Sequence, residues 1–240
     1  RARRLLLDIT DMGLPTATEL LDPIVPQYIA GLVCWAAIGA RTTESQTHRE
    51  MASGLSMPVG FKNCTDGELS TAVNAMIAAG SPQHLLGIDP DGQTCSVTTT
   101  GNPHTHLVLR GGSRPNYDSV SIEEARAILE AKGVPRAILV DCSHGNSRKN
   151  HTLQASVWQD VINQRLDGND AITGTMLESN LEAGNQKNTG DLQTLQYGVS
   201  ITDACIDWET TEKLILSAHE QLADRLESDG DSHSGRYKVE

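Results

Sequence analysis

The sequence predicts an α/β protein whose strands form a parallel, enclosed sheet of the barrel type. Apolar runs of strand length alternate with segments of helical spacing along most of the 240 residues, and such alternation is typical of parallel sheets. Three of the apolar runs end in a cationic residue followed by a Gly, Thr or Asn turn. The sequence has no Gly-x-Gly-x-x-Gly turn of the open dinucleotide-binding sheets, which favours the enclosed arrangement.

Six segments have the pattern of strands in such a sheet. They are residues 15–20, 32–40, 57–62, 106–110, 137–142 and 172–178. A closed barrel of this kind has about eight strands. The number of predicted strands is below that of a closed barrel, and the shortfall is at the beginning of the chain. There, residues 1–13 have the pattern of a helix that ends at Gly13.

Helices are predicted between and after the strands from apolar periodicity. The segments are residues 44–55, 65–80, 121–132, 152–166 and 214–226. Thr65 or Asp66 is expected to cap the second of them. Ser121-Ile-Glu-Glu reads as a capping box that opens the third.

One segment, residues 84–100, interrupts the alternation. Its two short runs flank the turn Asp89-Pro-Asp-Gly, which is typical of a β-hairpin inserted ahead of the strand at 106–110. Residues 228–240 are rich in Ser, Asp and Gly and are expected to form a disordered tail. The sequence therefore predicts one partial barrel domain over residues 1–227.

The composition excludes several classes of function. Acidic residues number 31 against 19 Lys and Arg, a formal net charge of -12, and there is no basic stripe, so nucleic acid is not an expected partner. No apolar stretch is long enough to span a bilayer. The five cysteines are scattered and include no Cys-x-x-Cys pair, which favours a reducing compartment and predicts a cytoplasmic protein.

Arg41, Lys62 and Arg110 are the three cations that end predicted strands. Side chains at this position of an α/β protein are exposed at one edge of the sheet, so we expect the three charges to converge. Converging cations bind an anion, most simply a small phosphate that also carries a carboxylate. The alternative for each is a surface cation paired with a nearby acid.

His144, Glu178 and Asp203 have the same kind of position later in the chain. His144 and Glu178 each lie just past a predicted strand, and Asp203 follows the last loop. One nitrogen and two oxygen donors on one face suit a divalent Mn, Fe, Co or Zn ion and disfavour calcium. The alternatives are a loop histidine, an acid at a helix start and a helix N-cap.

Six motifs around these residues resemble a single family. They are Ile-Gly-Ala-Arg-Thr-Thr-Glu-Ser-Gln (38–46), Pro-Val-Gly-Phe-Lys-Asn (58–63), Leu-Arg-Gly-Gly (109–112), Asp-Cys-Ser-His-Gly-Asn-Ser (141–147), Glu-Ser-Asn-Leu-x-x-Gly-Asn-Gln (178–186) and Ile-Thr-Asp-Ala-Cys (201–205). In this order the chain resembles the type I, feedback-regulated bacterial 3-deoxy-D-arabino-heptulosonate 7-phosphate (DAHP) synthases. The resemblance runs from residue 1 to about residue 226.

The resemblance implies a fold and a reaction. The fold is a (β/α)8 TIM barrel. The reaction condenses phosphoenolpyruvate with erythrose 4-phosphate and releases phosphate, the first step of the shikimate pathway and of aromatic amino acid biosynthesis. By the same resemblance, Arg41, Lys62 and Arg110 would hold the phosphate and carboxylate of phosphoenolpyruvate.

The resemblance also implies the remaining roles in the site. His144, Glu178 and Asp203 would be ligands of a divalent metal. Glu19 matches a family acid near the reacting water and the enolpyruvate carbon. Glu19 and Lys62 are therefore the expected catalytic residues.

The sequence departs from the family pattern at its start. The Gly-Pro-Cys-Ser motif, whose cysteine is a fourth metal ligand in the family, and the Lys-Pro-Arg-Thr-Thr motif are both missing. We therefore expect a chain without the first two barrel strands, which corresponds to the family's N-terminal third, and we expect it to be inactive or feeble. Cys142 lies two residues from His144, and we expect it to be a small buried side chain rather than a substitute ligand.

The resemblance further implies feedback regulation. The hairpin at 84–100 and residues 51–57 resemble the family's region for inhibition by an aromatic amino acid, and residues 47–57 lean toward the tyrosine-sensitive form. We also expect a homo-oligomer.

Three other functions remain open at this point. One is a sibling synthase that makes 3-deoxy-octulosonate 8-phosphate from arabinose 5-phosphate. Another is an aldolase that forms a Schiff base on Lys62. The third is a non-catalytic fragment that binds an aromatic amino acid or pairs with a full-length subunit.

Overall fold

Six parallel strands form the centre of the molecule, and they neighbour one another in chain order. The structure is a computed structural model that describes residues 1–89 and 91–230, with side chains described as far as residue 223. The strands are β1 (Ala17–Glu19), β2 (Trp35–Ile38), β3 (Val59–Lys62), β6 (Thr105–Leu109), β7 (Ile138–Asp141) and β8 (Ile172–Met176). Five of the six lie within a predicted segment, and β6 begins one residue before the segment predicted at 106–110. All five pairings are parallel.

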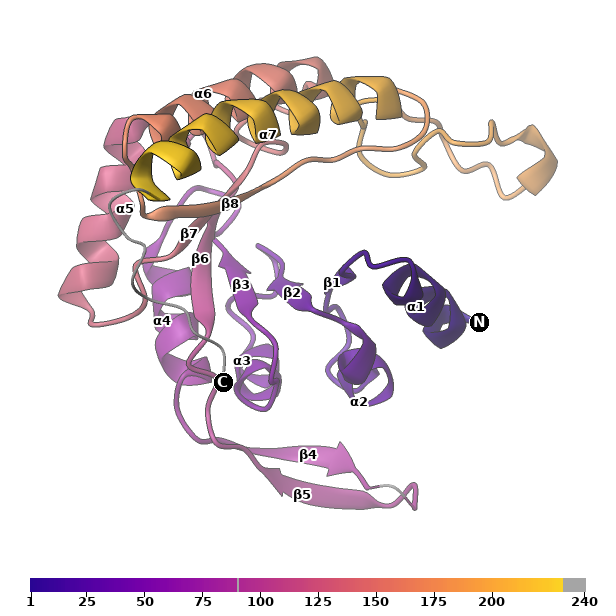
Figure 1. Ribbon diagram of the computed structural model, residues 1–240. Coiled ribbons are helices and arrows are strands. Elements are labelled where there is room, and N and C mark those ends of the chain that lie inside the picture. The colour runs from indigo at the N-terminus through magenta and orange to yellow at the C-terminus, as the bar shows by residue number, and fades with distance from the viewer. Residues whose placement is uncertain (90, 231–240) are drawn as a thin grey trace.

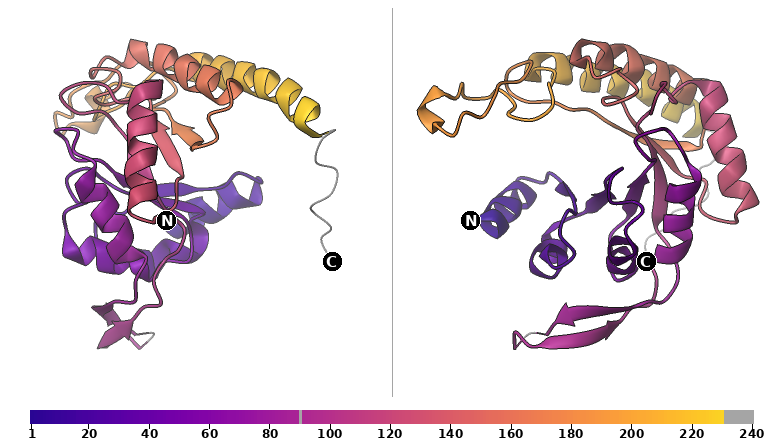
Figure 2. Two further views of the ribbon diagram at one scale, coloured as in Figure 1. Left: turned by 90° about the vertical axis from the view of Figure 1, so that its left-hand side faces the viewer. Right: turned by 180° about the vertical axis from the view of Figure 1, so that it is seen from behind.

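The sheet curls into an open arc with helices on its outer side (Figures 1 and 2). The helices are α1 (Ala2–Asp11), α2 (Val25–Ile29), α3 (Gln46–Ser53), α4 (Ser70–Ala79), α5 (Ser119–Ala131), α6 (Gln154–Leu166) and α7 (Trp208–Gly230). Figure 1 shows α4 and α5 around the convex side, α6 and α7 side by side, and α1 past β1 at the open side. In the described part of the chain, β1 and β8 are the edges of the sheet, which matches the prediction of a partial barrel.

The core between the sheet and the outer helices is aliphatic. Its fully buried strand residues include Ile38, Phe61, Leu107 and Ile138. The sequence contains a single Phe, so large aliphatic side chains and alanines fill the rest of this layer. Burying such side chains contributes about 1.5–3 kcal/mol each, and this holds the outer helices on the sheet.

The two predicted helix caps differ from those in the structure. The helix predicted to open at Ser121 begins at Ser119, because the carboxylate of Asp118 accepts hydrogen bonds from the backbone N–H of Ser121 at 3.1 Å and from its hydroxyl at 2.7 Å. The cap predicted at Thr65 or Asp66 is wrong. Asp66 instead accepts the N–H of residue 68 at 2.9 Å in a turn that precedes α4.

Other elements were not predicted or end elsewhere. The short helix α2 and the 3-10 turns Ala30–Leu32, His151–Leu153 and Leu192–Thr194 were missed, because turns this short carry little periodicity. The backbone of α7 continues to Gly230, and residues 231–240 of the predicted tail lie outside the described residues.

The predicted hairpin is confirmed and projects away from the sheet (Figure 1). It consists of β4 (His84–Ile88) and β5 (Thr94–Thr98). The side-chain amide of Gln27 in α2 donates to the carbonyl of Ile88 and accepts from its N–H, both at 3.2 Å. This pair of hydrogen bonds connects the hairpin to α2, in the N-terminal part of the chain.

The loops after β6 and β7 approach each other through glycines. A Cβ atom at position 145 would lie 2.7 Å from the carbonyl carbon of Gly111 and 2.7 Å from the nitrogen of Gly112. Such distances leave no room for a side chain. This contact places two loops that begin next to Arg110 and His144 against one another.

Gly145→Ala is therefore expected to lower the free energy of unfolding by about 1–3 kcal/mol, the usual cost of overpacking. Gly174→Ala is the matched control, because its added Cβ would meet Leu139 at an ordinary 3.5 Å. Urea unfolding of both variants measures the difference. Equal stabilities would show that the two loops can separate at no cost.

A polar pair joins β2 and β6 across β3, which lies between them in the sheet. The indole N–H of Trp35 donates to Nε2 of His106 at 3.0 Å. Burial lowers the pKa of His106 below its ordinary value, so the fold favours the neutral imidazole that can accept this bond. Protonation of the ring removes the acceptor.

We expect His106 to make the protein less stable in mild acid. Because the folded-state pKa is lowered, its contribution to stability is complete above the unfolded value of about 6.5 and is lost as the pH falls below it. Urea midpoints at about pH 7.5 and about pH 5.5, on either side of that value, measure the loss. His106→Gln should lose less than the wild type, and an equal loss in both would exclude His106 as the cause.

None of the described helices combines the length and the apolar character that crossing a membrane requires.

Candidate active site

A cavity of about 580 Å³ lies at the carboxyl ends of the strands. All seven residues that the sequence singled out line it. They are Glu19, Arg41, Lys62, Arg110, His144, Glu178 and Asp203. They come from every strand of the sheet or the loop that follows it, because parallel strands direct their carboxyl ends to the same edge.

The three cations differ in burial and in their partners. Lys62 ends β3 and Arg110 follows β6, and they are only 6% and 9% exposed. Arg41 follows β2 and is exposed. Of these three cations only Lys62 has a carboxylate partner among the described residues, so the alternative of an ordinary surface ion pair does not describe Arg41 or Arg110.

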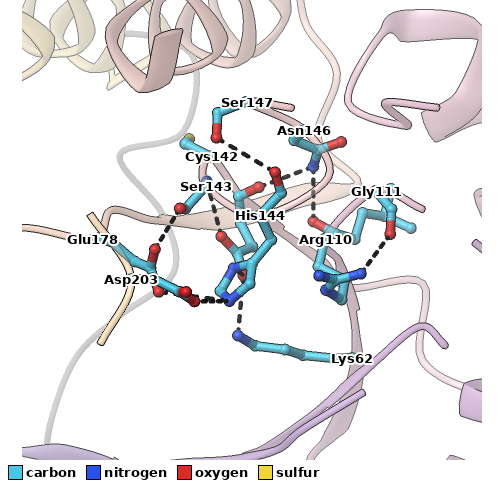
Figure 3. Close-up of polar contacts among 12 residues, drawn as sticks. Lys62, Arg110, Gly111, Cys142, Ser143, His144, Asn146, Ser147, Glu178 and Asp203 are labelled. Carbon is cyan, nitrogen blue, oxygen red and sulfur yellow. Dashed lines mark hydrogen bonds and ion pairs between the residues drawn. The ribbon is translucent and has the colours of Figure 1, made fainter. Parts of the chain in front are cut away.

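Arg110 is held by its neighbours rather than by an acid. Its backbone N–H donates to the side-chain oxygen of Asn63 at 2.8 Å, and its guanidinium donates to the carbonyl of Gly111 at 3.2 Å. Figure 3 shows the guanidinium directed toward the same region as Lys62 and His144. A buried guanidinium without a counter-ion is costly, so this position favours an anionic ligand.

The carboxylate partner of Lys62 is Asp141, the last residue of β7. Its Oδ2 lies 3.0 Å from Nζ of Lys62 and 2.8 Å from Nδ1 of His144. Burial opposes ionisation of Asp141, yet the side chains of His144 and Lys62 more than offset it and hold the pKa of the carboxyl below its ordinary value. Asp141 entered the sequence prediction only as the first residue of the motif at 141–147.

The metal-type donors also meet. One donor atom from each of His144, Glu178 and Asp203 lies within 4.8 Å of the others. Nε2 of His144 is 3.5 Å from Oε1 of Glu178 and 3.7 Å from Oδ2 of Asp203, and Figure 3 shows the ring facing both carboxylates. Donors bound to one ion at about 2.1 Å with tetrahedral angles lie about 3.4 Å apart, so the trio fits a divalent metal.

Glu178 is fixed from two sides. The buried amide of Gln154 donates to the carbonyl of Glu178 at 3.0 Å and accepts from its N–H at 2.8 Å. The hydroxyl of Ser143 donates to Oε2 at 2.5 Å, which leaves Oε1 facing His144. No local sequence pattern predicts the contact between Gln154 and Glu178.

Asp203 reaches the site through an irregular loop. Two isolated bridges, Asn185 with Ser200 and Gly184 with Cys205, form here instead of a strand. These bridges fold residues 199–205 back on the segment after β8. Asp203 remains the most exposed donor, with 71% of its side chain accessible.

Glu19 ends the edge strand β1 and lies over Gly39. A Cβ atom at position 39 would overlap its carboxylate, at 2.1 Å from Oε1. The absence of a side chain at Gly39 therefore gives this carboxylate its place in the cavity. Cys142 is fully buried and burial raises the pKa of its thiol, as expected of a small packing residue, and it is not in the donor group.

Several residues that line the cavity were not predicted from the sequence. They are Thr65, Ser143, Lys149, His151 and Asn185. Lys149 has a φ of 60°, in the left-handed region, which local sequence does not reveal for a lysine. Asn185 belongs to one of the recognised motifs and could have been selected from it.

The comparison with known families gives the same reading. The profile of the DAHP synthetase I family matches residues 5–216. The chain belongs to this family. The matched residues include every residue that lines the cavity, from Glu19 to Ala204.

Individual family members are similar over most of this chain. The tyrosine-sensitive phospho-2-dehydro-3-deoxyheptonate aldolase of Salmonella typhimurium is 52% identical over 94% of the chain, which spans 63% of that relative. The phenylalanine-sensitive enzyme of Escherichia coli is 51% identical over 89% of the chain, and the matched part is 61% of that relative's length.

A solved structure of the family has the same fold. The phospho-2-dehydro-3-deoxyheptonate aldolase of Francisella tularensis is 48% identical and superimposes with a TM-score of 0.87 over 92% of this chain and 64% of its own. The predicted α/β partial (β/α)8 barrel is thereby confirmed.

Proposed function

We propose that this protein acts in the aldol-type condensation of phosphoenolpyruvate with D-erythrose 4-phosphate, which gives DAHP and phosphate. The observation that carries the proposal is the meeting of cations and metal-type donors in one cavity at the carboxyl edge of the sheet. The named relatives support it, since they are aldolases of this type. The reaction is the first step of aromatic amino acid biosynthesis.

The cations bind phosphoenolpyruvate in this proposal. Arg110 and Lys62 lie buried on neighbouring strands β6 and β3, and Arg41 stands at the exposed side. Together they hold the phosphate and the carboxylate of the substrate and stabilise the charge that develops as phosphate leaves. Their fixed positions orient C3 of phosphoenolpyruvate toward the donor group.

The donor group would hold a divalent Mn, Fe, Co or Zn ion. When bound, the metal polarises the aldehyde oxygen of erythrose 4-phosphate as a Lewis acid. In the proposed reaction C3 of phosphoenolpyruvate bonds to the aldehyde carbon and the aldehyde oxygen takes a proton. Water adds at C2 and gives up its protons, and phosphate leaves as the bond between C2 and the phosphate oxygen breaks. The carboxylate of Glu19 is placed over Gly39 to orient this water.

The first experiment measures phosphoenolpyruvate consumption with Mn²⁺, with and without erythrose 4-phosphate and chelator. The chain is run beside a full-length tyrosine-sensitive relative, and binding of Mn²⁺ and phosphoenolpyruvate is measured on the same samples. Consumption that needs both the sugar phosphate and the metal supports the proposal. Binding of both ligands without turnover would support the non-catalytic fragment instead.

Two outcomes would contradict the proposed chemistry. Faster turnover with arabinose 5-phosphate than with erythrose 4-phosphate would assign the sibling synthase. Borohydride trapping of substrate on Lys62, with activity that survives chelator, would assign a Schiff-base aldolase. Failure to bind either Mn²⁺ or phosphoenolpyruvate would reject the site itself.

We also propose that an aromatic amino acid inhibits the protein, with tyrosine as the preferred effector. The hairpin is anchored near the end of α3, where the hydroxyls of Ser53 and Thr99 lie 2.7 Å apart, and to Gln27 in α2. Calorimetric titration with tyrosine, phenylalanine and tryptophan tests the preference. Gln27→Ala should weaken the binding because it frees the hairpin.

The remaining proposals concern assembly and compartment. We propose a homo-oligomer, supported by exposed apolar side chains near the start of the chain such as Leu5, Met12 and Leu14, and light scattering measures its mass. We propose a cytoplasmic protein, supported by the five free cysteines.

A further inference from the structure

One buried carboxylate oxygen is shared by the two halves of the cavity. Asp141 is fully buried, and its Oδ2 contacts both Lys62, at 3.0 Å, and His144, at 2.8 Å. Its other oxygen accepts the N–H of Ser143 at 2.9 Å. Lys62 belongs to the cations and His144 to the metal-type donors, so Asp141 is the point at which the two groups meet.

The contact with His144 involves the nitrogen that faces away from the other donors. Nδ1 lies beside Asp141, and Nε2 faces Glu178 and Asp203. A carboxylate next to Nδ1 favours the proton on that nitrogen and leaves the lone pair of Nε2 for a metal. It also fixes the ring, which stands on a residue with a left-handed φ of 52°.

The contact with Lys62 holds a cation that is only 6% exposed. Asp141 is the only acid within ion-pair distance of Lys62 among the described residues. Without it, the ammonium group would have to turn toward solvent or leave its place at the end of β3. The backbone N–H of Ser143 keeps the carboxylate itself in position.

We propose that Asp141 is a positioning residue for both halves of the site: it orients the ring of His144 for the metal and the ammonium of Lys62 for the anionic substrate. The inference rests on the proposed function. It predicts that one substitution outside the ligand set weakens the binding of two chemically unrelated ligands. A residue that only stabilises the fold would not produce that pattern.

The test measures the binding of Mn²⁺ and of inorganic phosphate to the 240-residue chain. Free Mn²⁺ is followed by electron paramagnetic resonance and phosphate by calorimetric titration. Asp141→Asn is expected to weaken Mn²⁺ binding by about 10–100-fold and phosphate binding by at least about tenfold. Asp118→Ala, which removes the cap of α5, is the control for a general loss of stability and should leave both affinities unchanged.

A second comparison covers the case in which Asp141→Asn leaves Lys62 unpaired and does not fold. Lys62→Met and the double variant Lys62→Met with Asp141→Leu differ only at position 141, and replacing both charges by apolar groups is often tolerated. Mn²⁺ binding should still be about 10–100-fold weaker in the double variant. The imidazole ¹⁵N resonances of His144, assigned with His144→Gln, should show the Nδ1–H form in Lys62→Met and a mixture in the double variant.

The outcomes separate the inference from the proposed function. If the wild type binds Mn²⁺ and phosphate but a folded Asp141→Asn protein retains both affinities, the inference alone is wrong. Equal Mn²⁺ affinity and an unchanged tautomer in the two Lys62→Met variants would overturn it as well. If the wild type binds neither ligand, the proposed function fails and the inference fails with it.

Discussion

His144→Ala is expected to abolish measurable tight binding of Mn²⁺ to this chain. His144 supplies the only nitrogen among the three donors, and its Nε2 lies between the carboxylates of Glu178 and Asp203 at 3.5 and 3.7 Å. Removal of a group that merely supports a ligand costs about 10–100-fold in affinity, so the loss of the ligand itself should exceed that. Titration of free Mn²⁺ by electron paramagnetic resonance gives the affinity directly.

His151→Ala is the matched control for this experiment. His151 lines the same cavity but is not among the donors, so its loss should change the affinity by less than about threefold, well below the cost of a supporting group. The prediction is contradicted if His144→Ala binds Mn²⁺ as the wild type does. An equal loss of Mn²⁺ affinity in both variants would indicate that the metal binds nearer to the loop that carries His151.

The strand ends were predictable because the signal is local. An apolar run that stops at a charged residue before a turn identifies the carboxyl end of a buried strand from a few neighbouring residues. Lys62 and His144 were found in this way. Their convergence follows from the parallel arrangement alone, since that arrangement brings all such ends to one edge.

The contacts that fix those side chains were not predictable. Lys62 and Asp141 are 79 positions apart, and they meet only because β6 is the single strand between β3 and β7. The two hydrogen bonds between Gln154 and the backbone of Glu178 likewise depend on how α6 packs against the end of β8. Pairings of this kind depend on the order and register of strands, which one sequence without its fold does not contain.

Helix caps were missed for a different physical reason. Asp118 and Ser121 are both good capping residues, and they lie within one turn of each other. The structure selects Asp118, whose carboxylate accepts both the N–H and the hydroxyl of Ser121. A charged acceptor forms the stronger hydrogen bonds, so the helix starts earlier than the capping-box pattern suggested.

Arg110→Met is expected to weaken the binding of phosphoenolpyruvate and of inorganic phosphate by about 2–5 kcal/mol, the usual cost of removing one partner from a buried charge pair. The guanidinium is 9% exposed and, among the described residues, is hydrogen-bonded to the carbonyl of Gly111 rather than to an acid. The anion would therefore be its main counter-charge. Calorimetric titration of both ligands measures the loss.

The same substitution should leave the unliganded protein as stable as before or more stable. A buried cation without a counter-ion costs free energy in the fold, and a methionine of similar length removes that cost. Urea unfolding without ligand tests the sign. If the unliganded wild type is less stable than Arg110→Met, the guanidinium lowers the stability of the fold. Such a group is retained for ligand binding rather than for stability.

Arg114→Ala is the control that separates a specific contact from general electrostatics. Arg114 is exposed and lines a neighbouring cavity with Arg148 and Lys149, so its removal changes the net charge of the chain by the same amount as Arg110→Met. If both variants lose phosphate affinity equally, the summed positive charge around the cavity, in a chain of net charge -12, would explain the binding better than one positioned guanidinium. A loss confined to Arg110→Met, with unchanged stability, would leave direct contact with the anion as the physical explanation.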